Sequence, residues 1–286
     1  MKRHLQAVLA FPLIALLLLG SAVGAAEVAS AADIAGAVVR PAKLTERPFR
    51  GIALVTIDDR VACTGFIVGP RKVVTAAHCL TRDASNGDYK FRRSLPQSVR
   101  IYRAYSDAAG GSPYRVCGVS RVWAHSKFIK RDSSDRQFGS RAHDYAVLTT
   151  ESGCSYPRNA VMRLWATEAD DGQLDVGRKV KIGGYPADPR FEDMNAFNLW
   201  RTDGEIWPVV PEEPRLLGVN AFVAQGMSGA PVWRSFGQGS PCGRSQCVVG
   251  IVVECEVNTK GLCRTGDSSR LAVRITPQVK ESIRKR

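Results

Sequence analysis

Short apolar runs alternate with polar turns along most of the chain. In the first half, six runs of mainly β-branched and apolar residues are the expected strands: 51–57, 62–68, 72–76, 99–104, 116–124 and 144–149. The pair Asp58-Asp59 supplies a turn between the first two runs, and residues 127–141 are polar and charged, as in a surface loop. Short strands with frequent turn signals predict an all-β barrel or sandwich.

The second half repeats this pattern. Val180 and Ile182 alternate with lysines, as on a half-buried strand. The expected strands lie at 179–182, 199–207, 216–222, 248–253 and 271–275, and a further, valine-containing strand surrounds Val232. Residues 277–286 predict a short C-terminal helix, because a proline stands near their start and basic residues stand towards their end.

The first 25 residues have the layout of a secretory signal peptide. Basic residues at 2–4 precede a short apolar run at 7–19 and small residues at 23–25. A membrane anchor, the alternative, needs a longer apolar span, and no later span is long and apolar enough to cross a membrane. We therefore expect cleavage after Ala25 or Ala26, and a protein that is secreted or periplasmic.

Residues 26–46 are expected to form a leader or an N-terminal arm. An alanine-rich stretch at 26–37 precedes a segment at 38–41 that can start an extended arm. The arm is either a cleaved propeptide or a belt around the mature domain, and we expect partial removal.

The charge is strongly basic. The net charge of the whole chain is +13, and loss of Lys2 and Arg3, with no acid, lowers it to +11 after export. Such a charge can concentrate a protein near anionic surfaces. The basic residues are scattered, apart from a short cluster at 284–286, so we expect weak surface adhesion and no specific nucleic-acid site.

The candidate chemistry centres on residues 225–232, Gln-Gly-Met-Ser-Gly-Ala-Pro-Val. Glycine permits tight turns and close backbone approach. Here it would free the amides of Gly226 and Ser228 to point at one spot, the arrangement that holds an oxyanion beside a nucleophilic hydroxyl. Taken alone, this pattern is often only a turn.

Two upstream segments complete a possible catalytic set. Residues 73–79 form an apolar strand and a small-residue turn that presents His78, and Asp144 directly precedes an apolar strand. A hydroxyl needs a base to take its proton, and the base works best when a carboxylate orients it. Because the order His, Asp, Ser is one of the known orders, we expect a triad of His78, Asp144 and Ser228. Neither His125 nor His143 has a matching motif, and neither is assigned a role.

These residues resemble the chymotrypsin-like serine proteases. Cys-Thr-Gly-Phe-Ile-Val-Gly-Pro at 63–70 and Thr-Ala-Ala-His-Cys at 75–79 look like the histidine-bearing half, and residues 226–231 look like the serine motif. The Gly-Tyr-Pro turn at 184–186 and the run at 228–233 are most similar to secreted bacterial glutamyl-endopeptidase-like proteases.

The resemblance implies an all-β fold of two six-stranded antiparallel barrels with a short C-terminal helix. We expect the first barrel in residues 47–160, with His78 and Asp144, and the second in 161–286, with Ser228. The implied activity is a serine endopeptidase that acts on proteins or peptides through an acyl-enzyme. This chemistry needs no metal or organic cofactor, and we expect a monomer.

The cysteines agree with export. Eight are present, an even number in a chain expected to reach an oxidising compartment. The resemblance implies a bridge between Cys63 and Cys79, which flank the histidine strand. Other pairs are open; those close enough for hairpin bridges are Cys242 with Cys247 and Cys255 with Cys263, and Cys117 and Cys154 remain. A zinc site is disfavoured, because no C-x-x-C occurs and the histidines do not cluster with the cysteines.

Substrate preference is expected to differ from that of the glutamate-cleaving relatives. These carry Gly-x-His on the strand after the serine, whereas Val252 occupies the matching histidine position here. By analogy with the fold, Phe222 and Val223 also line the primary specificity pocket. Glu254 either points to solvent or faces the pocket, where it could accept Lys or Arg. Since burying an unpaired carboxylate is costly, we expect cleavage after apolar, or else basic, residues and not after Glu.

A function of another class also fits the sequence. The chain could be a catalytically silent protease-like domain that binds a surface or a protein partner. The presence of all three triad residues favours the enzyme.

Overall fold

The computed structural model describes a defined part of the chain, with gaps. The described residues are 33–34, 37–82, 90–91, 95–129, 141–168, 174–188, 193–207, 213–235, 242, 246–255 and 270–286. The unit Ala31–Arg286 contains every element below. The expected signal peptide and Cys263 lie outside the described residues.

The first barrel is a closed antiparallel sheet in the order β10-β5-β4-β3-β8-β9. Its strands are β3 (Ile52–Ile57), β4 (Arg60–Gly69), β5 (Lys72–Thr75), β8 (Val99–Arg103), β9 (Cys117–Ala124) and β10 (Ala146–Thr150). Asp58 and Asp59 form the expected turn, and both have positive φ. The interior is filled by fully buried apolar side chains such as Val55, Ile67 and Leu148, which leaves a packed core.

The second barrel has the strand order β13-β12-β15-β16-β17-β14 and closes through β13–β14 pairing. Its strands are β12 (Lys179–Gly184), β13 (Trp200–Trp207), β14 (Leu216–Asn220), β15 (Pro231–Ser235), β16 (Gln246–Cys255) and β17 (Arg270–Arg274). The expected fold class of two six-stranded antiparallel barrels is therefore confirmed. We keep the division near residue 160 as our proposed domain boundary.

Several short strands and helices accompany the two barrels. They are β1 (Asp33–Ile34), β2 (Ala37–Pro41), β6 (Thr81–Arg82), β7 (Lys90–Phe91), β11 (Arg163–Leu164), α1 (Leu95–Ser98) and α2 (Ser126–Ile129). The expected surface loop at 127–141 differs at its start, because α2 buries Phe128, which is only 2% exposed. Residues 130–140 of that expected loop lie outside the described ranges.

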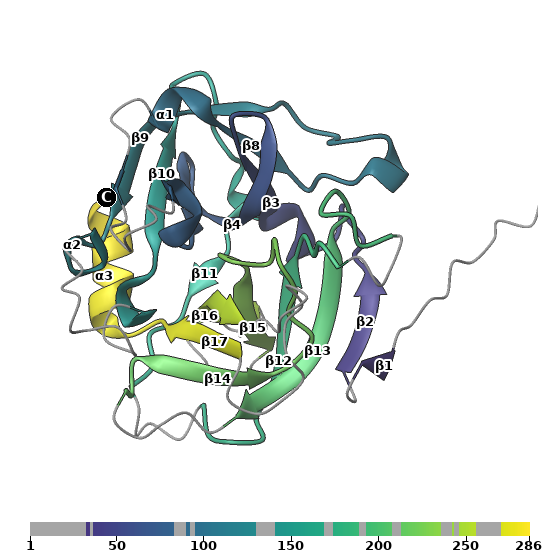
Figure 1. The fold of residues 1–286 in the computed structure, drawn as a ribbon, viewed down its shortest axis with the longest axis vertical. Helices are drawn as coiled ribbons and strands as arrows, with labels where there is room; N and C mark the ends of the chain where they lie inside the picture. Colours follow the sequence, from purple (N-terminus) through teal and green to yellow (C-terminus); the bar gives the residue numbers. More distant parts are fainter. Residues whose placement is uncertain are drawn as a thin grey trace, which may run out of the picture. The chain divides into compact units, whose positions relative to one another are not determined.

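The C-terminal helix α3 (Pro277–Lys285) forms as expected, with Thr276 as its N-cap. The Thr276 hydroxyl accepts a hydrogen bond from the Val279 amide, which satisfies one amide of the first turn. The end of the chain contacts the first barrel, because Lys72 donates to the Arg284 carbonyl and Arg121 to the Arg286 carbonyl. Figure 1 shows α3 beside β9 and β10.

An apolar cluster joins the two barrels. It contains Phe49, Ile52 and Phe66 from the first part of the chain and Trp233 and Ile251 from the second. The rings of Phe49 and Trp233 meet edge to face with centroids 5.9 Å apart. Since this interface is apolar and buried, it sets the distance between the barrel that carries His78 and the barrel that carries Ser228.

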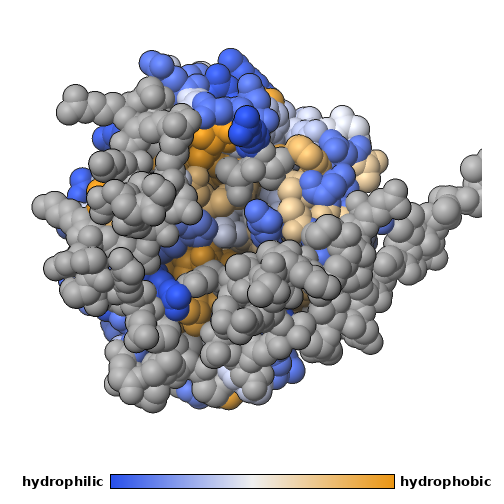
Figure 2. Space-filling model, viewed as in Figure 1, coloured by the Kyte–Doolittle hydropathy of each residue, from blue (hydrophilic) through white to orange (hydrophobic). Residues whose placement is uncertain are grey.

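The face of the molecule drawn in Figure 2 carries both apolar and hydrophilic residues. Figure 2 shows apolar residues towards the middle of the face and hydrophilic residues around them, with grey atoms over much of the rest. Among the described residues, disulfides join Cys63 to Cys79, Cys117 to Cys154 and Cys242 to Cys247. No helix among the described residues is apolar and long enough to span a membrane.

The arm segment β2 is a strand of the second barrel's sheet. It pairs antiparallel with β13, with Val39 opposite Thr202, and the Ala42 amide donates to the Leu199 carbonyl at 2.9 Å. The Val39 side chain is fully buried in the same cluster as Phe222. We therefore propose that residues 37–41 stay in the mature protein and that any cleavage of the leader falls before them.

Removing β2 is expected to destabilise the fold. A mature chain that begins at Ala42 exposes the site of Val39 and the edge of β13, so its free energy of unfolding should fall by about 2–3 kcal/mol. The matched control begins at Asp33 and keeps β2. Urea unfolding of both variants measures the difference, and equal midpoints would show that β2 contributes nothing to stability.

Candidate active site

His78 is held at the end of the strand that presents it. Strand β5 ends at Thr75, and a 3-10 turn, His78–Leu80, starts after two alanines that are fully buried. The full burial of both small side chains shows that this turn packs closely against the barrel. The Thr81 hydroxyl donates to the His78 carbonyl at 2.9 Å, which ties the far side of the turn.

Asp144 contacts His78 through both of its carboxylate oxygens. Oδ2 lies 2.7 Å from the His78 Nδ1, and Oδ1 accepts a hydrogen bond of 2.8 Å from the His78 backbone amide. The aspartate is 6% exposed. A carboxylate in this position favours the tautomer with the proton on Nδ1, which leaves Nε2 as the basic nitrogen. The structure thus brings two of the three predicted triad residues together.

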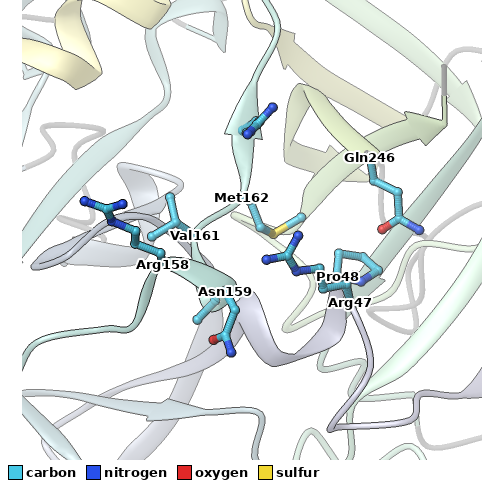
Figure 3. A pocket seen from close by; sticks show the side chains of 9 residues that line it. Arg47, Pro48, Arg158, Asn159, Val161, Met162 and Gln246 are labelled. Carbon is cyan, nitrogen blue, oxygen red and sulfur yellow. The ribbon is translucent and has the colours of Figure 1, made fainter. Parts of the chain in front are cut away.

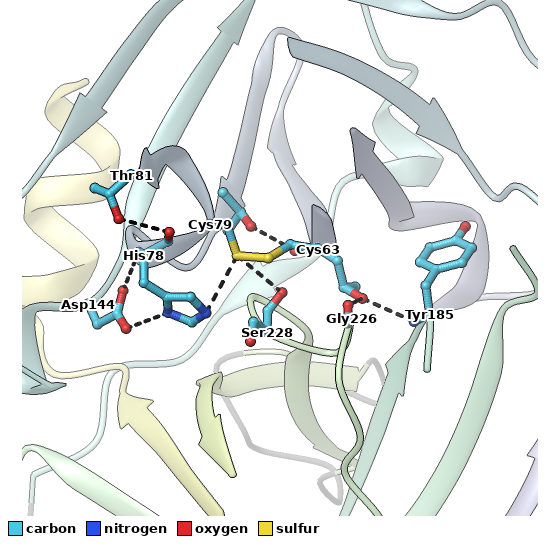
Figure 4. The surroundings of a disulfide bond; sticks show 10 residues. Cys63, His78, Cys79, Thr81, Asp144, Tyr185, Gly226 and Ser228 are labelled. Carbon is cyan, nitrogen blue, oxygen red and sulfur yellow. Dashed lines mark hydrogen bonds and ion pairs between the residues drawn. A yellow bond between two sulfur atoms is a disulfide. The ribbon is translucent and has the colours of Figure 1, made fainter. Parts of the chain in front are cut away.

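Ser228, the third predicted triad residue, lies beside the disulfide that also borders His78. Cys63 and Cys79 are joined, with Cα atoms 6.1 Å apart. The Cys79 sulfur is 3.8 Å from Nε2 of His78 and 3.8 Å from the Ser228 carbonyl oxygen. Figure 4 shows Asp144 on one side of the His78 ring and Ser228 towards the other. Cys63, His78 and Cys79 lie close together, but the two cysteine sulfurs are bonded to each other. They therefore offer no thiolate pair to a metal.

The turn that carries Ser228 depends on two glycines. Gly226 and Gly229 have φ of +85° and +84°, a conformation that other residues rarely adopt. A Cβ on Gly226 would overlap the Tyr185 carbonyl oxygen, and one on Gly229 would overlap the Thr64 carbonyl oxygen. Glycine is therefore required at both positions by shape as well as by φ.

The two amides predicted for the oxyanion hole are left unused within the turn. Three neighbouring amides are used: Met227 donates to Ala224 O, Ala230 donates to Met227 O, and Gly229 donates to Val252 O of β16. Within the described ranges, neither Gly226 nor Ser228 donates its backbone N–H to another residue. These two donors are thus available to a ligand.

The predicted specificity residues lie close to this turn. Val252 pairs with it directly, because its amide donates to Ala230 O at 2.9 Å and its carbonyl accepts from the Gly229 amide at 2.6 Å. Phe222 and Val223 are buried in the same apolar cluster as Val252. The Glu254 side chain lies outside the described residues, so its role stays a prediction.

Sequence reasoning missed a histidine pair next to Asp144. The rings of His125 and His143 stack with centroids 4.2 Å apart. Nη1 of Arg215 lies 2.9 Å from Nε2 of His143, and Arg215 forms two short hydrogen bonds to the Glu213 carboxylate. Arg215 precedes β14, so this contact links the segment that carries Asp144 to the second barrel. The adjacency of His143 and Asp144 was the one signal in the sequence.

This environment keeps His143 neutral. Burial, followed by the neighbouring positive charges of His125, Arg215 and Lys127, lowers the pKa of His143 to about 4, while Glu213 opposes the shift. Burial also lowers the pKa of His125, together with the charges of Lys127 and Arg215. Both rings therefore resist protonation more than a histidine in the unfolded chain does.

Acid should therefore weaken the fold through His143. Between pH 6.5 and 4 the unfolded chain takes up a proton at this residue and the folded protein does not, so the free energy of unfolding should fall as the pH falls. After allowance for partial exposure we expect a loss of about 1 kcal/mol. The variant His143→Gln keeps an acceptor for Arg215 and should flatten this dependence in urea unfolding, more than the control His125→Gln. An identical pH slope in wild type and His143→Gln would contradict this assignment.

A separate pocket of about 390 Å³ lies away from these groups. Figure 3 shows its lining, in which Arg47 and Pro48 face Met162 and the segment around Arg158. None of the predicted site residues lines this pocket. It therefore forms no part of the arrangement around His78.

Comparison with known proteins defines the class. The model of the trypsin-like peptidase domain matches residues 63–240, and the chain belongs to that family. The resemblance to chymotrypsin-like serine proteases is thus confirmed.

The individual relatives share limited sequence identity with this chain. The chain is 26% identical over 245 residues to the glutamyl endopeptidase of Bacillus licheniformis, covering 85% of this chain and 65% of that protein. It is 29% identical over 111 residues to the trypsin of Saccharopolyspora erythraea, covering 39% of this chain and 40% of that protein. The chain thus spans less than two thirds of the length of either curated relative.

A solved structure confirms the architecture. It is described as a Glu endopeptidase in complex with MPD and superimposes with a TM-score of 0.61. The match covers 86% of this chain and 95% of that one, at 18% sequence identity. At this identity the match shows a shared fold.

Proposed function

We propose that the protein is an exported serine endopeptidase that cleaves peptide bonds through Ser228, His78 and Asp144. The observation that carries the proposal is the contact of Asp144 with both the ring and the backbone amide of His78. A surface acid would not be buried with both oxygens on one histidine. Family membership and the relatives named as endopeptidases support the same activity.

In the proposed mechanism His78 acts first as a base and then as an acid. Its Nε2 takes the proton of the Ser228 hydroxyl as the serine oxygen attacks the peptide carbonyl. The resulting tetrahedral intermediate collapses when His78 donates that proton to the leaving amine, and an acyl-enzyme remains. A water molecule, deprotonated by His78, then attacks the acyl carbon, and His78 returns that proton to the Ser228 oxygen as the ester bond breaks and the acid product leaves. Asp144 stabilises the imidazolium that forms in both halves of the reaction.

The developing negative charge is assigned to the backbone of the serine turn. We propose that the Gly226 and Ser228 amides donate to the oxyanion, since no residue in the described ranges accepts from them. Fixed donors aimed at the charge lower the barrier because they need not reorganise during the reaction.

The competing function is a silent binding module, and a fluorophosphonate probe separates the two. The mature wild-type protein should be labelled, and Ser228→Ala should not, because the probe reacts with an activated serine. Folded wild-type protein that takes up no label would support the binding module. Size-exclusion chromatography of the same sample tests the expected monomer, and fractionation of the producing cells tests export.

Cleavage is expected after apolar residues, or else after basic ones, and not after Glu. The buried apolar side chains of Phe222, Val223 and Val252 offer no charged donor to an acidic substrate side chain. Profiling a peptide library by mass spectrometry measures the preference. A dominant preference for Glu would show that this view of the pocket is wrong.

The variant Glu254→Gln separates the two options for basic substrates. If the carboxylate faces the pocket, the variant should lose cleavage after Lys and Arg and keep cleavage after apolar residues. An unchanged profile would place Glu254 in solvent.

A further inference from the structure

Thr64 of the first barrel reaches across to the serine turn of the second. It lies on β4 directly after Cys63 and is fully buried. Its hydroxyl donates to the Gly226 carbonyl at 2.8 Å and accepts from the Tyr185 amide at 3.0 Å. Its own amide donates to the Ser228 carbonyl at 2.9 Å. Every one of these partners belongs to the second barrel.

These bonds hold alternate peptide groups of the turn. The Gly226 carbonyl, held by the Thr64 hydroxyl, belongs to the peptide between Gly226 and Met227, whose N–H donates to Ala224 O. The Ser228 carbonyl, held by the Thr64 amide, belongs to the peptide after the serine. The N–H groups proposed to bind the oxyanion lie on the two remaining peptides, one before each clamped peptide.

Thr64 therefore fixes the peptide that follows each donor-bearing peptide, while the carbonyls of the donor-bearing peptides accept from the Ala187 and Ala230 amides. Glycine at 226 is conformationally permissive, so its neighbouring peptides could rotate if they were not held. We infer that Thr64 is a positioning residue that holds the serine turn in its oxyanion-binding form. The inference rests on the proposed function and assigns a further residue to it.

The Thr64 residue is itself held in place. The Thr75 hydroxyl donates to the Thr64 carbonyl at 2.7 Å, and a β-branched side chain has few rotamers. Removing the hydroxyl would leave the Gly226 carbonyl and the Tyr185 amide buried without their partner, which favours rearrangement of the turn.

Neighbouring residues of β4 thus serve the two halves of the site. Cys63 is bridged to Cys79, next to His78, while Thr64 holds the turn that carries Ser228. Adjacent residues of a strand point to opposite faces, so one strand can hold both groups at once. The separation between base and oxyanion donors then depends on the rigidity of β4.

The test compares Thr64→Val, which removes the hydroxyl at nearly constant shape, with Thr64→Ser, which keeps it. Thr150→Val is the matched control, because Thr150 is equally buried on the first barrel and its hydroxyl donates to Cys154 O at 2.7 Å. Peptide turnover, thermal midpoint and the rate of fluorophosphonate labelling are measured for each variant and for wild type.

We expect Thr64→Val to lower kcat by about tenfold to a hundredfold with little change in KM, because the donors act on the transition state. Thr64→Ser should recover most of the loss. Thr150→Val should lower the thermal midpoint and leave kcat per folded molecule unchanged.

Three outcomes would overturn the inference and leave the proposed function standing. A folded Thr64→Val protein with wild-type kcat would do so, and so would equal losses of kcat in Thr64→Val and Thr150→Val, which would indicate a structural role alone. If Thr64→Val does not fold, Thr64→Ala and Thr64→Ser are compared, and equal kcat overturns it. Wild type that neither turns over peptide nor takes up label would instead overturn the proposed function, and the inference with it.

Discussion

Replacement of Ser228 by alanine is expected to lower kcat on a peptide substrate by about three to six orders of magnitude. The hydroxyl is the proposed nucleophile, and no other group described near His78 could replace it in forming an acyl-enzyme. Loss of His78 should cost a similar factor, because an unassisted hydroxyl is a poor nucleophile at neutral pH. Since the residues act as one unit, the double variant should be little worse than either single one.

The carboxylate variant tests the geometry of the pair. Asp144→Asn should lower kcat by about four orders of magnitude, since an amide can favour the wrong tautomer of His78.

The control for Ser228→Ala is Ser120→Ala, which removes a serine hydroxyl at an exposed position on β9. Circular dichroism and the thermal midpoint check folding. A folded Ser228→Ala protein that turns over substrate at the wild-type rate would end the proposal.

The second large effect is expected for Gly229→Ala, which should reduce the free energy of unfolding by about 2–5 kcal/mol. An alanine at this position must adopt φ of +84°, and its methyl group would overlap the Thr64 carbonyl oxygen and the Thr75 hydroxyl oxygen. Both neighbours are part of the contact between the barrels, so neither can move cheaply.

The variant Gly177→Ala separates the cost of the positive φ from the cost of the steric overlap. Gly177 has φ of +81°, and a Cβ there meets nothing within 4 Å, so this variant carries the backbone strain alone, about 1 kcal/mol. Urea unfolding measures both variants. A Gly229→Ala protein no less stable than Gly177→Ala would mean that the close approach of the serine turn to Thr64 is not rigid.

Most of the fold could be predicted from the pattern of the chain. Strands β3, β5, β9 and β16 lie within one or two residues of the apolar runs that predict them, because burial of alternate or continuous apolar side chains is what stabilises a strand in a barrel. Helix α3 was also predictable from local chemistry, since Pro277 favours the first turn and the terminal basic residues favour the last one.

The candidate site was partly predictable for the same reason. The glycines around Ser228 and the alanines before His78 are required by local backbone shape, so they mark their turns in the sequence. Asp144 could be placed from the strand that follows it. The short distances between Asp144 and His78 required the barrel.

The tertiary structure alone decided how distant segments meet. The hydroxyl of Thr64 and its acceptor Gly226 are 162 residues apart, and Arg215 reaches a histidine 72 residues away. The burial of Val39 likewise depends on the exposed edge of β13. A threonine, an arginine and a valine fit many environments, so nothing local in the sequence assigns their partners. Those partners follow from the packing of one barrel against the other.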